Sequence, residues 1–327
     1  MIKKDFNSGW MFSKRGEESN AVTVDLPHDA MLHEQRSRDA LPAGACGYFR
    51  EGCYDYVKTF EAPAEWKDGS VILELEAVYQ DSSVYLNGEL LEQHPYGYSN
   101  YYVDLSGKLS YGAQNEVKVT ADNSNAPNSR WYSGAGIIRP VHLYVGNSSH
   151  IVPDSVFISA DMDGRAEVSL EVTGGDEVRV IISRDGKEAA SAAGAVEDGK
   201  ACVRLCVEDP LLWDAEKPNL YDCEVILLDG VHEVDRDALE FGFRTISWGK
   251  DGFKVNGREV LLRGACVHHD NGILGACAFD EAEERRIRIL KEAGFNAVRS
   301  SHNPAAKGML RAADRLGMYI MDESFDM

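Results

Sequence analysis

The sequence has no uninterrupted apolar stretch of about 18 residues, the length that a membrane-spanning helix requires. It is also poor in basic residues: 34 lysines and arginines stand against 54 aspartates and glutamates, giving a formal net charge of -20. This balance argues against a nucleic-acid partner, because phosphate binding needs a basic surface. Two lysines near the N-terminus are not followed by an apolar segment, so we expect neither a signal peptide nor a membrane partner.

A disulfide framework is not expected either. The seven cysteines form an odd number without a tight spacing pattern. Cys202 and Cys206 are close in sequence but have no second pair elsewhere that would complete a zinc site. We therefore expect buried, reduced thiols in a cytoplasmic protein.

Helical periodicity is almost missing from the first ~250 residues, and short alternating runs take its place. Val71, Leu73 and Leu75 alternate with other side chains, and residues 84–86 run directly into Asn87-Gly88, a strong hairpin signal. Many short strands separated by turn signals predict β-sandwiches. We expect residues 1–147 to form a jelly-roll.

A second β module is expected over residues 148–247. It has strands at 178–182 and 221–228, with a hairpin turn at Asp185-Gly186. A module of this length with many short strands is typical of an immunoglobulin-like sandwich, although the Cys-Trp-Cys arrangement of antibody domains is missing.

The pattern changes after residue 248. Strands are expected at 260–262, 296–298 and 318–321, with a helix before each of the last two. The second helix is expected to be capped by Asn303 and to have Pro304 as its first residue. Strand, helix, strand, helix, strand predicts a parallel α/β unit. A (β/α)8 barrel needs eight of each, so we interpret 248–327 as the incomplete start of a barrel in a piece of a longer chain.

Polar and ionisable side chains follow each of the three expected barrel strands, where a barrel keeps its functional groups. The segments are 263–270, 299–304 and 322–326. Three such endings in register with the strands predict a site at this edge of the sheet.

These segments resemble a known family. LLRGACVHHDNGILG, GFNAVRSSHNP and LGMYIMDESFDM are similar to the opening of the catalytic barrel of glycoside hydrolase family 2, which includes β-galactosidases, β-glucuronidases and β-mannosidases. LPHDAML, GYFR, VYLNGELL and NSRWYSGAGIIRPVHLYV resemble its sugar-binding jelly-roll. DPLLWDAEKPNLYDCEV and FGFRTISW resemble its immunoglobulin-like domain. The resemblance covers essentially the whole chain.

The resemblance implies substrate contacts on the barrel. His268 and His302 match family histidines that contact sugar hydroxyls, and imidazole can donate or accept such hydrogen bonds. Arg299 is expected to support the site through carboxylates. A structural role remains the alternative for each of the three. His269 and Asp270 match less well and are expected in a solvated loop.

Three further contacts are implied on the jelly-roll, in loops that reach the barrel mouth and narrow the sugar pocket: Asp29, Arg130 and Trp131. Some family members have an acidic residue near the position of Arg130, so this chain departs from them and leaves the sugar open. Trp131 either stacks on a sugar ring or packs in a core.

Asp322 and Glu323 are adjacent carboxylates, and neighbouring residues of a strand point to opposite faces. They cannot both flank one glycosidic bond, so we expect them to support the site. The resemblance implies that the acid/base and nucleophilic glutamates lie on later strands, beyond Met327. We therefore expect no catalytic residue within the chain and no activity from the chain alone.

No cofactor is expected. Some family members bind a magnesium ion through a glutamate at the position where this chain has Met327, so no metal is expected here, although a divalent cation in the full-length enzyme stays open. The expected function is retaining hydrolysis of terminal β-linked sugars, with β-galactosidase favoured. The alternatives are a β-glucuronidase, a β-mannosidase or a non-catalytic carbohydrate-binding fragment. Open parallel edges promote association, so a homo-oligomer is expected.

Overall fold

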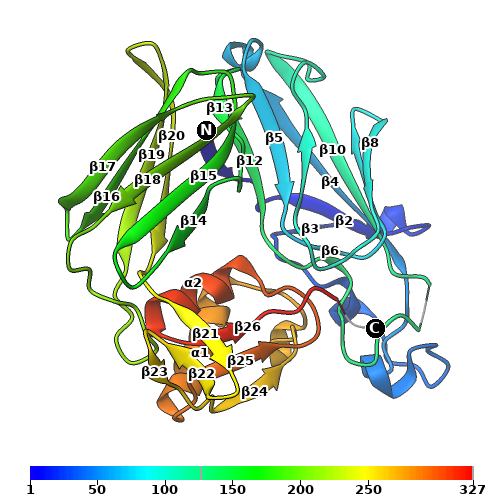
Figure 1. Cartoon of the computed structure of the whole chain (residues 1–327). Helices are drawn as coiled ribbons and strands as arrows, with labels where there is room; N and C mark the ends of the chain where they lie inside the picture. The colour runs from blue at the N-terminus through cyan, green and yellow to red at the C-terminus, as the bar shows by residue number, and fades with distance from the viewer. Residues whose placement is uncertain (126, 326–327) are drawn as a thin grey trace.

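The computed structural model describes residues 1–125 and 127–325. Met327, the position at which the resemblance led us to expect no metal ligand, lies outside the described residues. Two antiparallel β-sandwiches stand side by side, and a smaller parallel α/β unit lies beneath both of them (Figure 1). We call these parts the first sandwich, the second sandwich and the barrel segment.

The first sandwich is formed by a four-stranded sheet, a six-stranded sheet and a short two-stranded ladder. The four-stranded sheet has the order β1 (Ile2–Asp5), β12 (Val141–Gly146), β5 (Ser70–Leu75) and β9 (Tyr101–Asp104). The six-stranded sheet has the order β3 (Val22–Val24), β2 (Trp10–Lys14), β4 (Cys53–Ala62), β10 (Ala113–Asp122), β7 (Ser82–Leu86) and β8 (Glu89–His94). The two-stranded ladder pairs β11 (Gly136–Ile137) with β6 (Val78–Tyr79). Short 3-10 helices lie at η1 (Glu18–Asn20), η2 (Ala30–His33), η3 (Ala43–Cys46) and η4 (Ala64–Trp66).

The alternation seen in the sequence forms the core of this sandwich. Val71, Leu73 and Leu75 of β5 are fully buried between the sheets. The predicted hairpin is confirmed, because Asn87 and Gly88 join β7 to β8 with φ of 50° and 86°. Positive φ at both central residues is what a tight two-residue turn requires.

The second sandwich has its own core. One sheet contains β13 (His150–Ile151), β15 (Arg165–Thr173), β14 (Phe157–Ala160) and β18 (Lys200–Cys206); the other contains β17 (Lys187–Ala195), β16 (Glu177–Arg184), β19 (Tyr221–Asp229) and β20 (His232–Phe241). The turn predicted at Asp185-Gly186 joins β16 to β17. A small sheet of β21 (Ile246–Gly249), β22 (Gly252–Val255) and β23 (Arg258–Glu259) leads on to the barrel segment.

The barrel segment has the predicted parallel order, but two of its elements begin later than predicted. It contains β24 (Gly264–Val267), η5 (Gly272–Leu274), α1 (Asp280–Glu292), β25 (Ala297–Ser300), α2 (Lys307–Leu316) and β26 (Tyr319–Met321), with β24–β25–β26 parallel. The strand predicted at 260–262 is wrong, since the apolar run precedes β24 and Leu261 is 74% exposed. The cap predicted at Asn303 is wrong as well, because α2 begins at Lys307.

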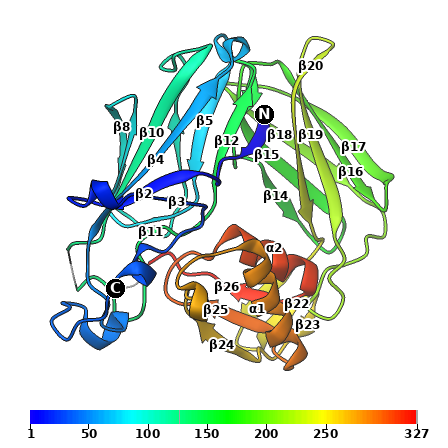
Figure 2. The same cartoon turned by 180° about the vertical axis from the view of Figure 1, so that it is seen from behind.

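The barrel segment packs against both sandwiches (Figure 2). Ala276 joins a small buried cluster with residues of the first sandwich. On the other side, Trp213 donates its indole N–H to the carbonyl of Asp314 in α2, at 2.8 Å. The three parts therefore meet through buried contacts.

The structure shows how exposed the cysteines are and whether any helix could cross a membrane. All seven cysteines are free, but only Cys46, Cys223 and Cys277 are buried, so the expectation of uniformly buried thiols was wrong. Within residues 1–125 and 127–325, no helix has the length and apolar character needed to cross a membrane.

Candidate functional site

Parallel strands bring three polar side chains from the barrel segment to one edge of the sheet. His268 follows β24, His302 follows β25 and Glu323 follows β26. Because the carboxyl ends of parallel strands lie at the same edge, residues far apart in sequence meet here. The rings of His268 and His302 stand nearly perpendicular, with centroids 5.6 Å apart.

An indole from the first sandwich completes this group. Trp131 stacks on His268 with ring centroids 5.1 Å apart, and it meets His302 edge-on at 5.2 Å. Nδ1 of His268 is buried and has no hydrogen-bond partner among the described residues. An aromatic face beside an unsatisfied imidazole nitrogen suits a ligand with both an apolar face and hydroxyl groups, such as a sugar ring.

Glu323 holds the second histidine and Arg299. Its carboxylate accepts hydrogen bonds from Nδ1 of His302 at 2.8 Å and from Nε of Arg299 at 2.7 Å. Burial alone would raise the pKa of Glu323, but the hydrogen bonds from His302 and Arg299 outweigh it and keep the pKa below its ordinary value. Glu323 is therefore an acceptor that orients the His302 ring.

Asp322 has different partners from its neighbour. Its carboxylate accepts the backbone N–H of Ala305 at 2.9 Å, in the segment between β25 and α2. The two adjacent carboxylates thus contact different elements, although both follow β26 and are not part of the strand itself.

Cys266 is a site neighbour that the sequence did not single out. Nη1 of Arg299 lies 3.4 Å from its sulfur, and the thiol is exposed. The hydrogen bond from Arg299 lowers the pKa of Cys266 below its ordinary value. A lone cysteine without a motif gives no sequence signal for this contact.

Asp29 lies buried at the junction of the first sandwich and the barrel segment. One carboxylate oxygen accepts the N–H groups of Met31 and Ala135, and the other accepts the Tyr132 hydroxyl and the N–H of Ala276. Burial raises the pKa of Asp29 above its ordinary value. Its hydrogen bonds hold the loop that carries Trp131 against the loop that follows His268.

The same junction demands a residue without a side chain. Gly275 has φ of +60°, and a Cβ there would lie 2.2 Å from a carboxylate oxygen of Asp29. A glycine permits both the backbone conformation and the close approach.

Arg130 is at the outer side of the cluster. Its side chain is exposed, and its guanidinium lies 5.9 Å from the centroid of the Trp131 ring. The structure thus places His268, His302, Trp131, Arg299, Arg130 and Glu323 around one point. Asp29 and Asp322 do not belong to this group, because their carboxylates accept hydrogen bonds from backbone N–H groups of neighbouring segments.

A metal does not fit the residues at hand. Within residues 1–125 and 127–325, no group of three or more His, Cys, Asp and Glu side chains could hold one.

Comparison with known proteins identifies the family. The family model described as "Glycosyl hydrolases family 2" matches residues 149–244, and "Glycosyl hydrolases family 2, TIM barrel domain" matches residues 247–325. The chain belongs to glycoside hydrolase family 2. Its similarity to relatives of this family extends over the first sandwich as well.

Among the curated relatives, beta-galactosidase BoGH2A of Bacteroides ovatus is 34% identical and the match covers 99% of this chain and 41% of the relative. A beta-glucuronidase of Bacteroides fragilis is 26% identical, covering 97% of this chain and 48% of the relative. The crystal structure of a family 2 member from Bacteroides cellulosilyticus superimposes with a TM-score of 0.92 at 31% identity, covering 100% of this chain and 46% of that one. The chain spans less than half the length of these three proteins.

Proposed function

We propose that the enzyme to which this chain belongs hydrolyses terminal β-galactosides with retention of configuration. The observation that carries the proposal is the contact of Trp131 with both His268 and His302 at the carboxyl ends of parallel strands. An aromatic platform with imidazole donors at a barrel mouth is suited to binding a sugar ring. The relationship to a curated beta-galactosidase at 34% identity supports the choice of sugar.

Each residue has a distinct task in this proposal. Trp131 covers the apolar face of the terminal sugar, and the His268 imidazole hydrogen-bonds a sugar hydroxyl. Glu323 fixes the ring of His302 by accepting its Nδ1–H, so that Nε2 faces the substrate as an acceptor. Arg299 neutralises Glu323 and keeps its carboxylate in place.

We infer that the acid/base and nucleophilic glutamates lie on later barrel strands, outside residues 1–327. Retaining hydrolysis needs two carboxyl groups about 5–5.5 Å apart on facing elements. Glu323 is engaged with Arg299 and His302, and Asp322 with Ala305, so neither is placed to form such a pair with the other. Residues 1–327 then supply substrate contacts and no covalent chemistry.

A β-glucuronide is the second candidate substrate. Arg130 places a guanidinium beside the Trp131 ring, where it could pair with the carboxylate of an acidic sugar. Relatives named beta-glucuronidase support this alternative. An Arg130→Gln variant separates the two, because it weakens hydrolysis of a glucuronide much more than that of a galactoside.

The decisive experiment compares residues 1–327 with a version extended through a whole barrel. Both are assayed with nitrophenyl β-galactoside, β-glucuronide and β-mannoside. We expect activity from the extended protein alone, with the galactoside hydrolysed fastest. Activity from residues 1–327 that disappears in Glu323→Gln would assign Glu323 to catalysis and overturn the placement of the glutamates. Sugar binding without hydrolysis by the extended protein would instead indicate a carbohydrate-binding role.

We also propose that residues 1–327 associate into a homo-oligomer. The three-stranded parallel sheet has β24 and β26 at its two edges, and unpaired edges favour association. Light scattering measures the mass of residues 1–327, and a monomer contradicts the proposal.

A further inference from the structure

The segment that carries His302 is held by the first sandwich as well as by the barrel segment. Residues 301–306 join β25 to α2, and Arg139, which lies between β11 and β12, contacts this segment from the first sandwich. Its guanidinium donates to the carbonyl of Pro304 at 2.7 Å, to that of Ala305 at 3.5 Å and to that of Tyr98 at 3.0 Å. Arg139 is only 3% exposed, so these carbonyls replace the water that its charge would otherwise attract.

A buried carboxylate of the first sandwich caps the helix that follows. Glu76 accepts the backbone N–H of Lys307, the first residue of α2, at 2.8 Å. The residue before the helix is Ala306, whose side chain cannot cap. A negative charge at a helix N-terminus satisfies an unpaired N–H group and interacts favourably with the helix dipole. This contact also explains why α2 begins at Lys307 and not after Asn303.

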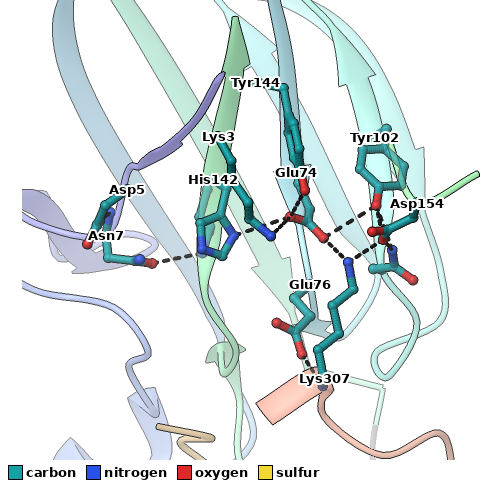
Figure 3. Close-up of polar contacts among 12 residues, drawn as sticks. Lys3, Asp5, Asn7, Glu74, Glu76, Tyr102, His142, Tyr144, Asp154 and Lys307 are labelled. Carbon is teal, nitrogen blue, oxygen red and sulfur yellow. Dashed lines mark hydrogen bonds and ion pairs between the residues drawn. The ribbon is translucent and has the colours of Figure 1, made fainter. Parts of the chain in front are cut away.

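The Lys307 side chain is anchored at the same place (Figure 3). Its ammonium pairs with the fully buried Glu74 of β5 and with Asp154 of the second sandwich. Lys3 and His142 also lie within 3.1 Å and 3.2 Å of the Glu74 carboxylate. The hydroxyls of Tyr102 and Tyr144 also donate to the Glu74 carboxylate. All three parts of the molecule therefore meet at the start of α2.

A third contact acts nearer to the histidine. The Tyr96 hydroxyl donates to the side-chain oxygen of Asn303 at 2.6 Å. Asn303 is buried and directly follows His302. Backbone groups of 304, 305 and 307 and the side chain of 303 are thus fixed from the first sandwich. The barrel segment contributes the contact of Asp322 with Ala305, the hydrogen bond from Ser300 to the Asn303 carbonyl, that from the Ser301 N–H to the Val267 carbonyl, and that between Glu323 and His302.

We propose that Arg139 and Glu76 are positioning residues: they fix residues 303–307, and through them hold the His302 imidazole against the Trp131 ring. The first sandwich then contributes Trp131 to the candidate site and also determines the position of His302 on the barrel segment. The inference rests on the proposed function only in giving His302 a role in substrate binding. Its structural content can be tested without any substrate.

The test measures amide hydrogen exchange of residues 1–327 by mass spectrometry. In Glu76→Ala and Arg139→Met we expect the peptide covering 301–310 to exchange about tenfold faster, since a buried hydrogen bond at its start is lost. Peptides of the second sandwich should keep their rates. Glu76→Gln retains a carbonyl acceptor for the Lys307 N–H and should stay close to the unchanged protein.

A matched control is available in the second sandwich. Arg184 lies 5.6 Å from the Tyr221 ring and donates to Asn219 at 3.0 Å, so Arg184→Met removes a comparable guanidinium elsewhere. This variant should accelerate exchange near 177–184 and leave 301–310 unchanged. If Arg139→Met does not fold, the comparison of Glu76→Ala with Glu76→Gln decides alone.

The fluorescence of Trp131 reports the position of the histidine. The emission of Trp131 is obtained by subtracting, for each variant, the emission spectrum of the same variant that also carries Trp131→Phe. Release of His302 from the ring in Glu76→Ala should change this signal in the same direction as His302→Ala does, and Arg184→Met should leave it unchanged. Uniformly faster exchange along the whole chain, or unchanged exchange at 301–310 with unchanged Trp131 emission, overturns the proposal.

The extended enzyme separates this inference from the proposed function. Glu76→Ala is expected to lower kcat/KM about tenfold, and Glu76→Gln and Arg184→Met should not. If the extended enzyme is inactive on every sugar, the proposed function fails while the exchange and fluorescence results still decide the positioning role.

Discussion

The carboxylate of Asp29 accepts the backbone N–H of Ala276 at 2.8 Å, across 247 residues of sequence. The same oxygen accepts the hydroxyl of Tyr132, next to Trp131. One buried side chain thus connects the loop that supplies the indole to the loop that follows His268. The distance between the Trp131 indole and the His268 imidazole therefore depends on a contact between the first sandwich and the barrel segment.

Replacement of Asp29 should therefore be costly. Asp29→Ala leaves three N–H groups and one hydroxyl without their acceptor in a buried place, and we expect it to lower the free energy of unfolding by about 3 kcal/mol. Asp25→Ala is the control, because Asp25 is exposed and accepts a single N–H group, that of Gly9. Chemical denaturation measures both. A loss from Asp29→Ala no larger than that from Asp25→Ala would show that the link contributes little.

Glu74 should make the protein sensitive to acid. Burial alone would raise its pKa, but the contact with the His142 imidazole and the ion pairs with Lys307 and Lys3 hold it well below its ordinary value of 4.5. The folded state thus binds the proton more weakly than the unfolded state does. The stabilisation is complete above pH 4.5 and is lost as the pH falls below it, by about 1.4 kcal/mol per pH unit until the folded pKa is reached.

The comparison of Glu74→Gln with the unchanged protein isolates this effect. Between about pH 6 and about pH 3.5, the unchanged protein should lose about 1.4 kcal/mol more unfolding free energy than the variant does. Glu65→Gln removes an exposed carboxylate and should lose as much as the unchanged protein. Equal losses in Glu74→Gln and the unchanged protein would contradict the assignment.

Cys266 should be the most reactive thiol. It is exposed and its pKa is lowered by the hydrogen bond from Arg299, whereas burial raises the pKa of Cys223 and of Cys277 to about 12. The thiolate is the reactive form, so iodoacetamide near neutral pH should label Cys266 first. Mass spectrometry of tryptic peptides follows the order of labelling. In Arg299→Met the rate at Cys266 should fall to that of the exposed Cys202.

Trp131 should contribute to sugar affinity through its ring. In the extended protein we expect Trp131→Ala to weaken binding of galactose at least about fivefold, because loss of an aromatic contact costs about 1 kcal/mol. Trp131→Phe retains an aromatic face and should lose less. Isothermal titration measures both, and equal affinity of the alanine variant would place Trp131 outside the sugar site.

The sequence predicted the elements whose signal is local. The alternation of Val71, Leu73 and Leu75, the Asn87-Gly88 turn and the parallel order of the barrel segment are all confirmed. The polar residues expected at strand ends also meet, since Trp131 contacts both His268 and His302. Their contact with substrate stays a prediction.

What the sequence could not predict depends on partners far along the chain. The start of α2 was misplaced because its cap is Glu76, which lies 231 residues earlier. The apolar run at 260–262 was mistaken for a strand because apolar periodicity does not reveal which side chains remain exposed, as Leu261 does. The four internal bonds of Asp29 likewise have no short-range signature.

The cap that Glu76 gives to α2 also has a consequence for protein synthesis. Domains generally fold in the order in which they leave the ribosome, N-terminal first. We therefore expect the carboxylate of Glu76 and the guanidinium of Arg139 to be in place when residues 303–307 emerge, where the folded protein has them in contact. The first sandwich then acts as a template for the first helices of the barrel, and we expect that grafting this barrel onto a foreign N-terminal domain requires both side chains to be carried along.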